Sequence, residues 1–171
     1  MEQCVYFSDQ FFSAGKTDIY NDAQELVGQL DLKSAFTSSL NVENEKGDVI
    51  IEGGFPFFSR KWNVTNAEGK VLGRVKDSFS FFTKRYSYTT DSETYEIESP
   101  AFSKEYTILN EQKTEAATFK KVSGFFQSAA YELRNSSSSL QTEELIAVVM
   151  GVNAIEKRNS SNAGNAGGGA T

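Results

Sequence analysis

The chain contains no histidine and only one cysteine, Cys4, among its 171 residues. The first absence removes the commonest general base and metal ligand of proteins, and the second excludes an intramolecular disulfide. No calcium-loop run and no GK[ST] phosphate loop occurs. We therefore predict no enzymatic activity, no cofactor and no metal site, and we expect Cys4 to be a buried structural cysteine rather than a nucleophile.

Basic residues are outnumbered, with 17 Lys and Arg against 23 Asp and Glu. This balance argues against a general nucleic-acid binder, which would be basic. The segment Met1–Phe7 lacks the basic start and the apolar core of a signal peptide, and a lone thiol is typical of a reducing compartment. We expect a cytoplasmic protein, either free or bound peripherally at the inner membrane surface.

Long apolar runs are also scarce, because only Leu145–Ile155 qualifies, and Asn153 alone interrupts it with a polar side chain. The flanking residues predict a helix over 142–158, with Thr142 as N-cap and Asn159 just past the end. A helix that is apolar on all sides is buried in protein or in lipid. Eleven residues are too few to cross a bilayer, which takes about 20, so burial in protein is favoured over a transmembrane segment.

The rest of the chain repeats one unit built on a phenylalanine followed by a polar residue. The repeated phenylalanines are Phe12, Phe36, Phe58, Phe82, Phe102 and Phe126. Segments such as Trp62–Thr65 follow them and alternate apolar with polar residues, which predicts strands with one buried face. Turns containing Gly47 or Gly69 then lead into returning strands. Together with an opening and a closing strand, the repeats predict about twelve strands joined as a meander.

An open sheet of that size would leave exposed edges and an uncovered apolar face, so closure into a barrel is favoured. A barrel of twelve strands is too wide for its own side chains to fill, since about eight strands already suffice for that. The apolar helix is the natural filling. We predict an all-β fold, a closed antiparallel meander barrel around one C-terminal buried apolar helix, over residues 1–159. Residues 160–171, rich in Ser, Asn, Gly and Ala, are expected to form a disordered tail.

The hairpin over Lys61–Val75 and the helix Leu145–Ile155 resemble those of the tubby C-terminal-like superfamily. Within it, the chain is most similar to the LURP-one-related proteins and their small bacterial members, and more distantly to phospholipid scramblases. The resemblance spans roughly Cys4 to Arg158 and implies the barrel with its central helix. Tubby domains imply phosphoinositide binding, and scramblases imply lipid transfer and calcium binding, but no functional residue of either group matches a position of this chain.

Charge is distributed unevenly along the repeats, because acidic residues gather at the turns within them and basic residues near the phenylalanines. In a meander these two sets lie at opposite ends of the barrel. The candidate anion-binding or lipid-binding residues of the basic rim are Arg60, Lys61, Lys76, Lys84 and Arg85. Matching positions two strands apart would place Arg60 and Lys61 about 10 Å from Lys84 and Arg85, with Lys76 in the gap between them. The alternative is that these charges only keep the strand ends soluble while the phenylalanines cap the core.

We therefore predict a non-enzymatic binding or scaffold module of unknown ligand, with the basic rim as its candidate surface and anionic phospholipid or an acidic protein as its candidate partners. The main alternative is peripheral binding of anionic phospholipid, such as a phosphoinositide, through the same rim. A scramblase-like membrane function and a carrier of small apolar ligands are further alternatives. A carrier would need an empty barrel, with the helix packed outside it.

Overall fold

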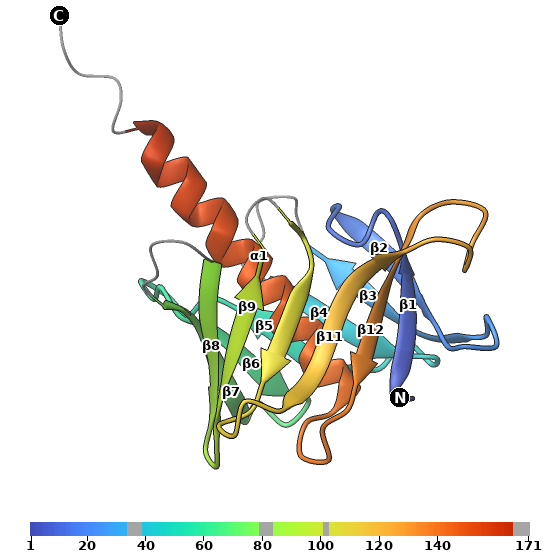
Figure 1. Cartoon of the computed structure of the whole chain (residues 1–171), viewed down its shortest axis with the longest axis horizontal. Coiled ribbons are helices and arrows are strands. Elements are labelled where there is room, and N and C mark those ends of the chain that lie inside the picture. The colour runs from blue at the N-terminus through green and yellow to red at the C-terminus, as the bar shows by residue number, and fades with distance from the viewer. Residues whose placement is uncertain (34–38, 79–83, 101–102, 166–171) are drawn as a thin grey trace, which may run out of the picture.

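The computed structural model describes residues 1–33, 39–78, 84–100 and 103–165, which form one helix and twelve strands (Figure 1). The strands are β1 (Cys4–Ser8), β2 (Gly15–Tyr20), β3 (Leu26–Leu32), β4 (Ser39–Asn44), β5 (Val49–Gly54), β6 (Trp62–Asn66), β7 (Val71–Ser78), β8 (Lys84–Thr90), β9 (Thr94–Ser99), β10 (Tyr106–Leu109), β11 (Glu115–Val122) and β12 (Ala130–Asn135). The helix is α1 (Thr142–Asn165). Three of the repeated phenylalanines, Phe36, Phe82 and Phe102, lie outside the described residues.

The strands form a closed barrel in which each strand pairs antiparallel with the next along the chain. The last strand, β12, returns to the first, so that Cys4 lies opposite Arg134 and Phe7 lies opposite Tyr131. Closure leaves no unpaired edge in the sheet. The predicted all-β closed meander of twelve strands is confirmed.

Alternation along the strands separates the barrel interior from its surface. In β6, Trp62 and Val64 are buried, and in β9 the same pattern buries Tyr95 and Ile97. The inward side chains of the strands and the apolar residues of α1 make one continuous core. Neither the barrel nor the helix could bury its apolar surface without the other.

Helix α1 runs through the barrel and leaves it at one end, as Figure 1 shows. The indole Nε1 of Trp62 donates a hydrogen bond to the helix carbonyl of Ala147 at 3.1 Å. Gly53 and Gly151 make room for this indole, since a Cβ on either would lie 2.7 or 2.5 Å from a ring atom of Trp62. The predicted burial of the helix inside the barrel is confirmed, so the helix fills the space in which the ligand of a carrier would lie.

Both ends of the helix differ in detail from the sequence prediction. Thr142 is the first helical residue rather than the N-cap, and its hydroxyl donates to the carbonyl of Glu2. The helix also continues to Asn165, past the end expected at Arg158. The Ser160 and Ser161 hydroxyls donate to the carbonyls four residues earlier, which satisfies these groups within the helix. Residues 160–165, which were expected to belong to a disordered tail, are therefore helical. Residues 166–171 lie outside the described residues.

The two ends of the barrel are distinguished by the two ends of α1. Near the helix start, Glu143 lines a pocket together with Glu45 of the turn between β4 and β5. Near the helix end, Arg158 donates a hydrogen bond to the carbonyl of Ser59 in the connection between β5 and β6. We call the region around residues 55–61 and 156–160 the exit end.

Candidate functional site

The connection between β5 and β6 exposes two phenylalanine side chains at the exit end. Phe57 is 89% exposed and Phe58 is 94% exposed, and their ring centroids lie 4.1 Å apart. A lone exposed apolar residue is unremarkable, but an adjacent pair of nearly fully exposed aromatic rings forms an apolar patch. Such patches mark surfaces that contact a protein, a ligand or a membrane.

A tight turn holds this phenylalanine pair away from the barrel. The Ser59 amide donates to the carbonyl of Pro56 at 2.9 Å, and the φ angle of Phe58 is 59°. Left-handed backbone is unfavourable for a bulky residue and costs about 1–3 kcal/mol. The backbone therefore accepts strain where the two rings point outward, a combination that is common at functional loops.

The other phenylalanine pairs of the described residues are covered by neighbouring rings. Phe11 is fully buried, with its ring centroid 5.0 Å from that of Phe119. Phe125 stacks on Tyr6 at a centroid distance of 3.7 Å. The pair at 57–58 thus differs from these repeats in structure although it matches them in sequence. The sequence alone did not distinguish this exposed pair from the covered ones.

Arg158 joins the exit of the helix to the same connection. Its guanidinium carbon lies 3.6 Å from the ring centroid of Phe55, and its Nη1 donates to the carbonyl of Ser59 at 2.9 Å. Cation–π contact and hydrogen bonding together fix the guanidinium over the loop. Arg158 was not among the predicted site residues, because its distance in sequence from the loop gives no sign of the contact.

A small pocket of about 230 Å³ lies beside this arginine. Its lining residues are Phe55, Arg60, Asp77, Ile155, Arg158 and Asn159. Two arginines and one aspartate therefore border a common space. Among the described residues, Arg60 and Asp77 form no ion pair, so both charges are available to a ligand.

Three of the five predicted rim residues carry charges without a carboxylate partner in the described part of the chain. Arg60 lines the pocket, Lys61 is exposed directly before β6, and Lys76 is exposed on β7. Arg60 and Lys61 immediately follow the exposed phenylalanine pair and Ser59. They share the exit end with Arg158, which strengthens the positive field there.

The two remaining rim residues are adjacent in β8 and point to opposite faces of the sheet. Lys84 is directed inward, with its Nζ 3.5 Å from Oε1 of Glu156 on the helix. Arg85 is directed outward, with its Nη2 3.2 Å from Glu98 and its Nε 3.6 Å from Glu96. Both charges are balanced locally, so these residues do not form one surface with each other.

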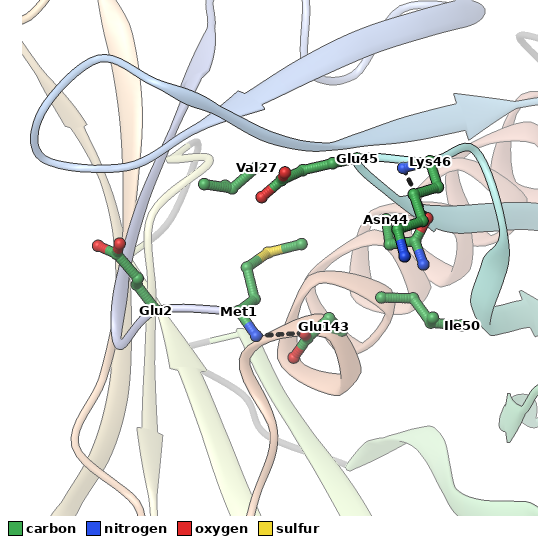
Figure 2. A pocket seen from close by; sticks show the side chains of 8 residues that line it. All are labelled: Met1, Glu2, Val27, Asn44, Glu45, Lys46, Ile50 and Glu143. Atoms are coloured by element: carbon green, nitrogen blue, oxygen red, sulfur yellow. Dashed lines mark hydrogen bonds and ion pairs between the residues drawn. The ribbon is translucent and has the colours of Figure 1, made fainter.

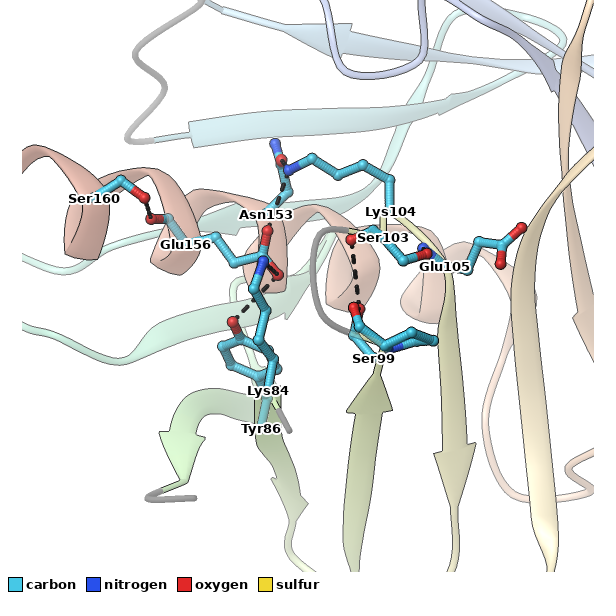
Figure 3. Close-up of polar contacts among 10 residues, drawn as sticks. Lys84, Tyr86, Ser99, Ser103, Lys104, Glu105, Asn153, Glu156 and Ser160 are labelled. Carbon is cyan, nitrogen blue, oxygen red and sulfur yellow. Dashed lines mark hydrogen bonds and ion pairs between the residues drawn. The ribbon is translucent and has the colours of Figure 1, made fainter. Parts of the chain in front are cut away.

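Figure 3 shows the polar cluster that surrounds Glu156. Its Oε1 accepts a hydrogen bond from the Tyr86 hydroxyl at 3.2 Å, and its Oε2 lies 3.1 Å from Lys104. Lys104 also donates to Oδ1 of Asn153 at 2.6 Å. Burial and the neighbouring Glu156 raise the pKa of Tyr86 above its ordinary value. This cluster ties the helix to β8 and to the segment just before β10, and it was not among the predicted sites.

The opposite end of the barrel has more acidic than basic side chains around its pocket. A pocket of about 490 Å³ at the helix start is shown in Figure 2. It is lined by Met1, Glu2, Val27, Asn44, Glu45, Lys46, Ile50 and Glu143. The amino terminus lies 2.7 Å from Oε1 of Glu143. Carboxylates predominate around this pocket, so an anionic ligand would meet repulsion here.

Catalytic and metal-binding chemistry gains no support from the described residues. Within them, no three His, Cys, Asp or Glu side chains are grouped so that they could hold a metal ion. Cys4 is 7% exposed, and burial raises the pKa of its thiol, which lowers its reactivity. None of the helical residues that the structure describes forms a segment with the length and hydropathy needed to cross a bilayer.

Comparison with known proteins identifies the fold and the family. A solved structure of a protein from Arabidopsis thaliana has a TM-score of 0.58 and 9% sequence identity, covering 88% of this chain and 90% of that one. At this identity the likeness shows the fold alone. No curated protein matches the chain. The family model described as LURP-one-related matches residues 5–147, which is most of the barrel and the start of the helix. The chain therefore belongs to the LURP-one-related family.

Proposed function

We propose that this protein is a binding module that attaches peripherally to anionic phospholipid surfaces through the exit end. The observation that carries the proposal is the exposed pair Phe57 and Phe58 beside Arg60 and Lys61, whose charges have no carboxylate partner in the described part of the chain. Of the predicted rim, Arg60 and Lys61 belong to this surface, and Lys76 lies on the neighbouring strand β7. Lys84 and Arg85 contribute less because carboxylates balance them.

The arrangement combines the two attractions that hold peripheral proteins at a membrane. Aromatic rings enter the interface between headgroups and acyl chains, where their transfer from water is favourable. Each Lys or Arg near an anionic surface contributes about 1 kcal/mol. Because neither attraction alone gives stable attachment, their presence in one loop supports membrane binding better than either feature would separately.

Geometry favours the same orientation for the whole molecule. The exit end carries the phenylalanines and two arginines, Arg60 and Arg158, that form no ion pair within the described residues, whereas the carboxylates around Glu45 and Glu143 lie near the other end of the helix. A negatively charged surface attracts the first end and repels the second. The protein would therefore dock with the helix exit toward the lipid despite its formal net charge of −6.

Vesicle co-sedimentation tests the proposal directly. Wild type is expected to bind vesicles of phosphatidylglycerol and phosphatidylcholine and not vesicles of phosphatidylcholine alone, with binding weakened by salt. The double variant Arg60→Ser/Lys61→Ser should bind about thirtyfold more weakly, since it loses roughly 2 kcal/mol. Phe57→Ser/Phe58→Ser should lose about tenfold or more and keep its stability, because both side chains are already exposed.

Matched controls lie at the other end of the barrel. Lys46→Ser/Lys70→Ser removes two charges from the turns after β4 and β6, and Leu26→Ser removes an apolar side chain that is 45% exposed. Both should bind vesicles as wild type does. If the control variants weaken vesicle binding as much as the exit-end variants do, binding depends on net charge alone, and the exit end is not a specific binding surface. If wild type binds neither kind of vesicle, the surface does not bind lipid, and an acidic protein becomes the expected partner.

Localisation follows from the same proposal. A module of this kind would lie in the cytoplasm and associate peripherally with the inner membrane surface. Fractionation of cells should find wild type in the membrane fraction and release it with high salt, whereas the Phe57→Ser/Phe58→Ser variant should remain in the soluble fraction. A wild-type protein that stays soluble in low salt would contradict this prediction.

A further inference from the structure

The pocket beside Arg158 carries a feature that anionic attraction does not explain. Alongside the two basic residues Arg60 and Arg158, it is lined by one acidic residue, Asp77. No ion pair joins Asp77 to either arginine in the described part of the chain. A bare phosphate bound to the arginines would therefore meet repulsion from Asp77.

We propose that this pocket binds the headgroup of an aminophospholipid, with its phosphate on Arg60 and Arg158 and its primary ammonium group on Asp77. Both charges of such a headgroup find an opposite charge in the pocket, and each contact is a charge-assisted hydrogen bond. Phosphatidylethanolamine has this chemistry, whereas phosphatidylserine adds a carboxylate that would lie close to Asp77. The inference rests on the proposed membrane-binding function and specifies the lipid class for that site.

The donors needed for a phosphate remain available on the two arginines. Arg158 uses Nη1 for the Ser59 carbonyl, which leaves its Nη2 and Nε hydrogens for a ligand. Arg60 makes no side-chain hydrogen bond within the described residues, so its whole guanidinium fork is free. The contact of Arg158 with the Phe55 ring orients this cation before a ligand arrives, which lowers the entropy cost of binding.

The strand register explains why Asp77 faces the pocket rather than the outer surface. Asp77 pairs with Tyr86, and Tyr86 is directed inward toward Glu156 of the helix. Residues directly opposite each other in an antiparallel pair point to the same face. Asp77 is thus an inward-facing carboxylate at the mouth of the barrel. Its neighbours in β7, Lys76 and Ser78, point to the outer face.

The position of the pocket suits a lipid that stays in its bilayer. Arg158 contacts Phe55 and Ser59, which flank the turn that exposes the phenylalanine pair. A lipid headgroup in the pocket would therefore be held next to the point where Phe57 and Phe58 enter the interface. Its volume of about 230 Å³ lies below the range of about 300–1,000 Å³ that is typical of drug-sized ligands, as expected for a headgroup alone.

Vesicles with equal anionic content and different neutral lipids test the inference. One set contains phosphatidylethanolamine, and the other contains phosphatidylcholine, whose quaternary ammonium has no hydrogen to donate. Wild type should prefer the first set by about tenfold, the effect of one charge-assisted hydrogen bond. Asp77→Asn should lose this preference and still bind both sets through the phenylalanines and basic residues. Asp91→Asn, in the exposed turn after β8, is the matched control and should keep the preference.

A titration without membranes keeps the test independent of the proposed function. Amide NMR shifts are measured with O-phosphoethanolamine and with inorganic phosphate as probes. We expect O-phosphoethanolamine to shift Asp77, Arg60 and Asn159, to bind more tightly than phosphate, and to lose this advantage in Asp77→Asn. Binding of free O-phosphoethanolamine without any lipid preference would identify the soluble phosphoamine as the ligand.

The possible failures are distinguishable. If wild type binds both vesicle sets equally and the two free probes bind alike, the aminophospholipid inference is wrong while membrane attachment stands. If no vesicle binds but O-phosphoethanolamine still shifts the pocket residues, the proposed membrane function is wrong and the pocket assignment stands. Shifts confined to the opposite end of the barrel would overturn the pocket assignment itself.

Discussion

At the scale of single residues, the most consequential group outside the exit end is the buried carboxyl of Glu144. It is 5% exposed and bonds to the Tyr88 hydroxyl inside the barrel. Burial raises the pKa of Glu144 above its ordinary value of 4.5, although the hydrogen bond from Tyr88 opposes the shift. The folded protein therefore keeps this proton to a higher pH than the unfolded chain does.

This pKa shift predicts a pH dependence of stability with a definite sign. The contribution of protonated Glu144 is fully present below pH 4.5 and is lost as the pH rises through the raised pKa of the folded state. Urea unfolding at a series of pH values should show that Glu144→Gln gains stability relative to wild type as the pH rises. Glu68→Gln, in the turn between β6 and β7, serves as control and should show no such trend. A constant difference between Glu144→Gln and wild type would contradict the prediction.

At the scale of elements, the fit between α1 and the barrel depends on small residues around Trp62. Gly151 faces the indole from the helix and Gly53 faces it from β5, and neither position has space for a Cβ. Glycine in a helix interior is about 1 kcal/mol less favourable than alanine. At position 151, the space needed for packing against β5 and β6 thus outweighs the lower helix propensity of glycine.

Gly151→Ala should destabilise the protein for this reason. Overpacking against the Trp62 ring costs about 1–3 kcal/mol, more than the gain of about 1 kcal/mol in helix propensity. Ser161→Ala, at an exposed position of the same helix, should change the free energy of unfolding by less than about 0.5 kcal/mol. In a double-mutant cycle, Trp62→Phe should offset part of the Gly151→Ala loss because the smaller ring leaves room. A stabilising Gly151→Ala would show that this contact is loose.

At the scale of the whole molecule, barrel and helix form one cooperative unit. The single tryptophan, Trp62, touches the helix backbone and the Phe55 ring, so its fluorescence reports on helix packing. Far-ultraviolet circular dichroism reports mainly on the strands. We expect the two signals to give coincident urea transitions, the mark of two-state unfolding. An earlier change in fluorescence would mean that the helix leaves the barrel before the sheet unfolds.

Much of this architecture could be predicted from the sequence because it depends on periodicity. Alternation such as that of Trp62 and Val64 distinguishes strand faces, and the repeat spacing gives the number of strands. The apolar run Leu145–Ile155 requires a covering on all sides, and only a closed barrel provides it. The helix continues to Asn165, past the predicted end, and within this extension the Ser160 and Ser161 hydroxyls bond to carbonyls of the same helix, which composition does not reveal.

The barrel, its central helix and the basic residues after Phe57 and Phe58 can all be read from the order of residues along the chain. Which charges meet depends instead on how the barrel closes. Residues 84 and 85 are neighbours in sequence but face opposite sides of β8, while Arg158 and Asp77 share a pocket with Arg60 from three separate elements. The physical reason is that period and composition act along the chain, whereas a binding site depends on side chains that closure of the barrel brings together.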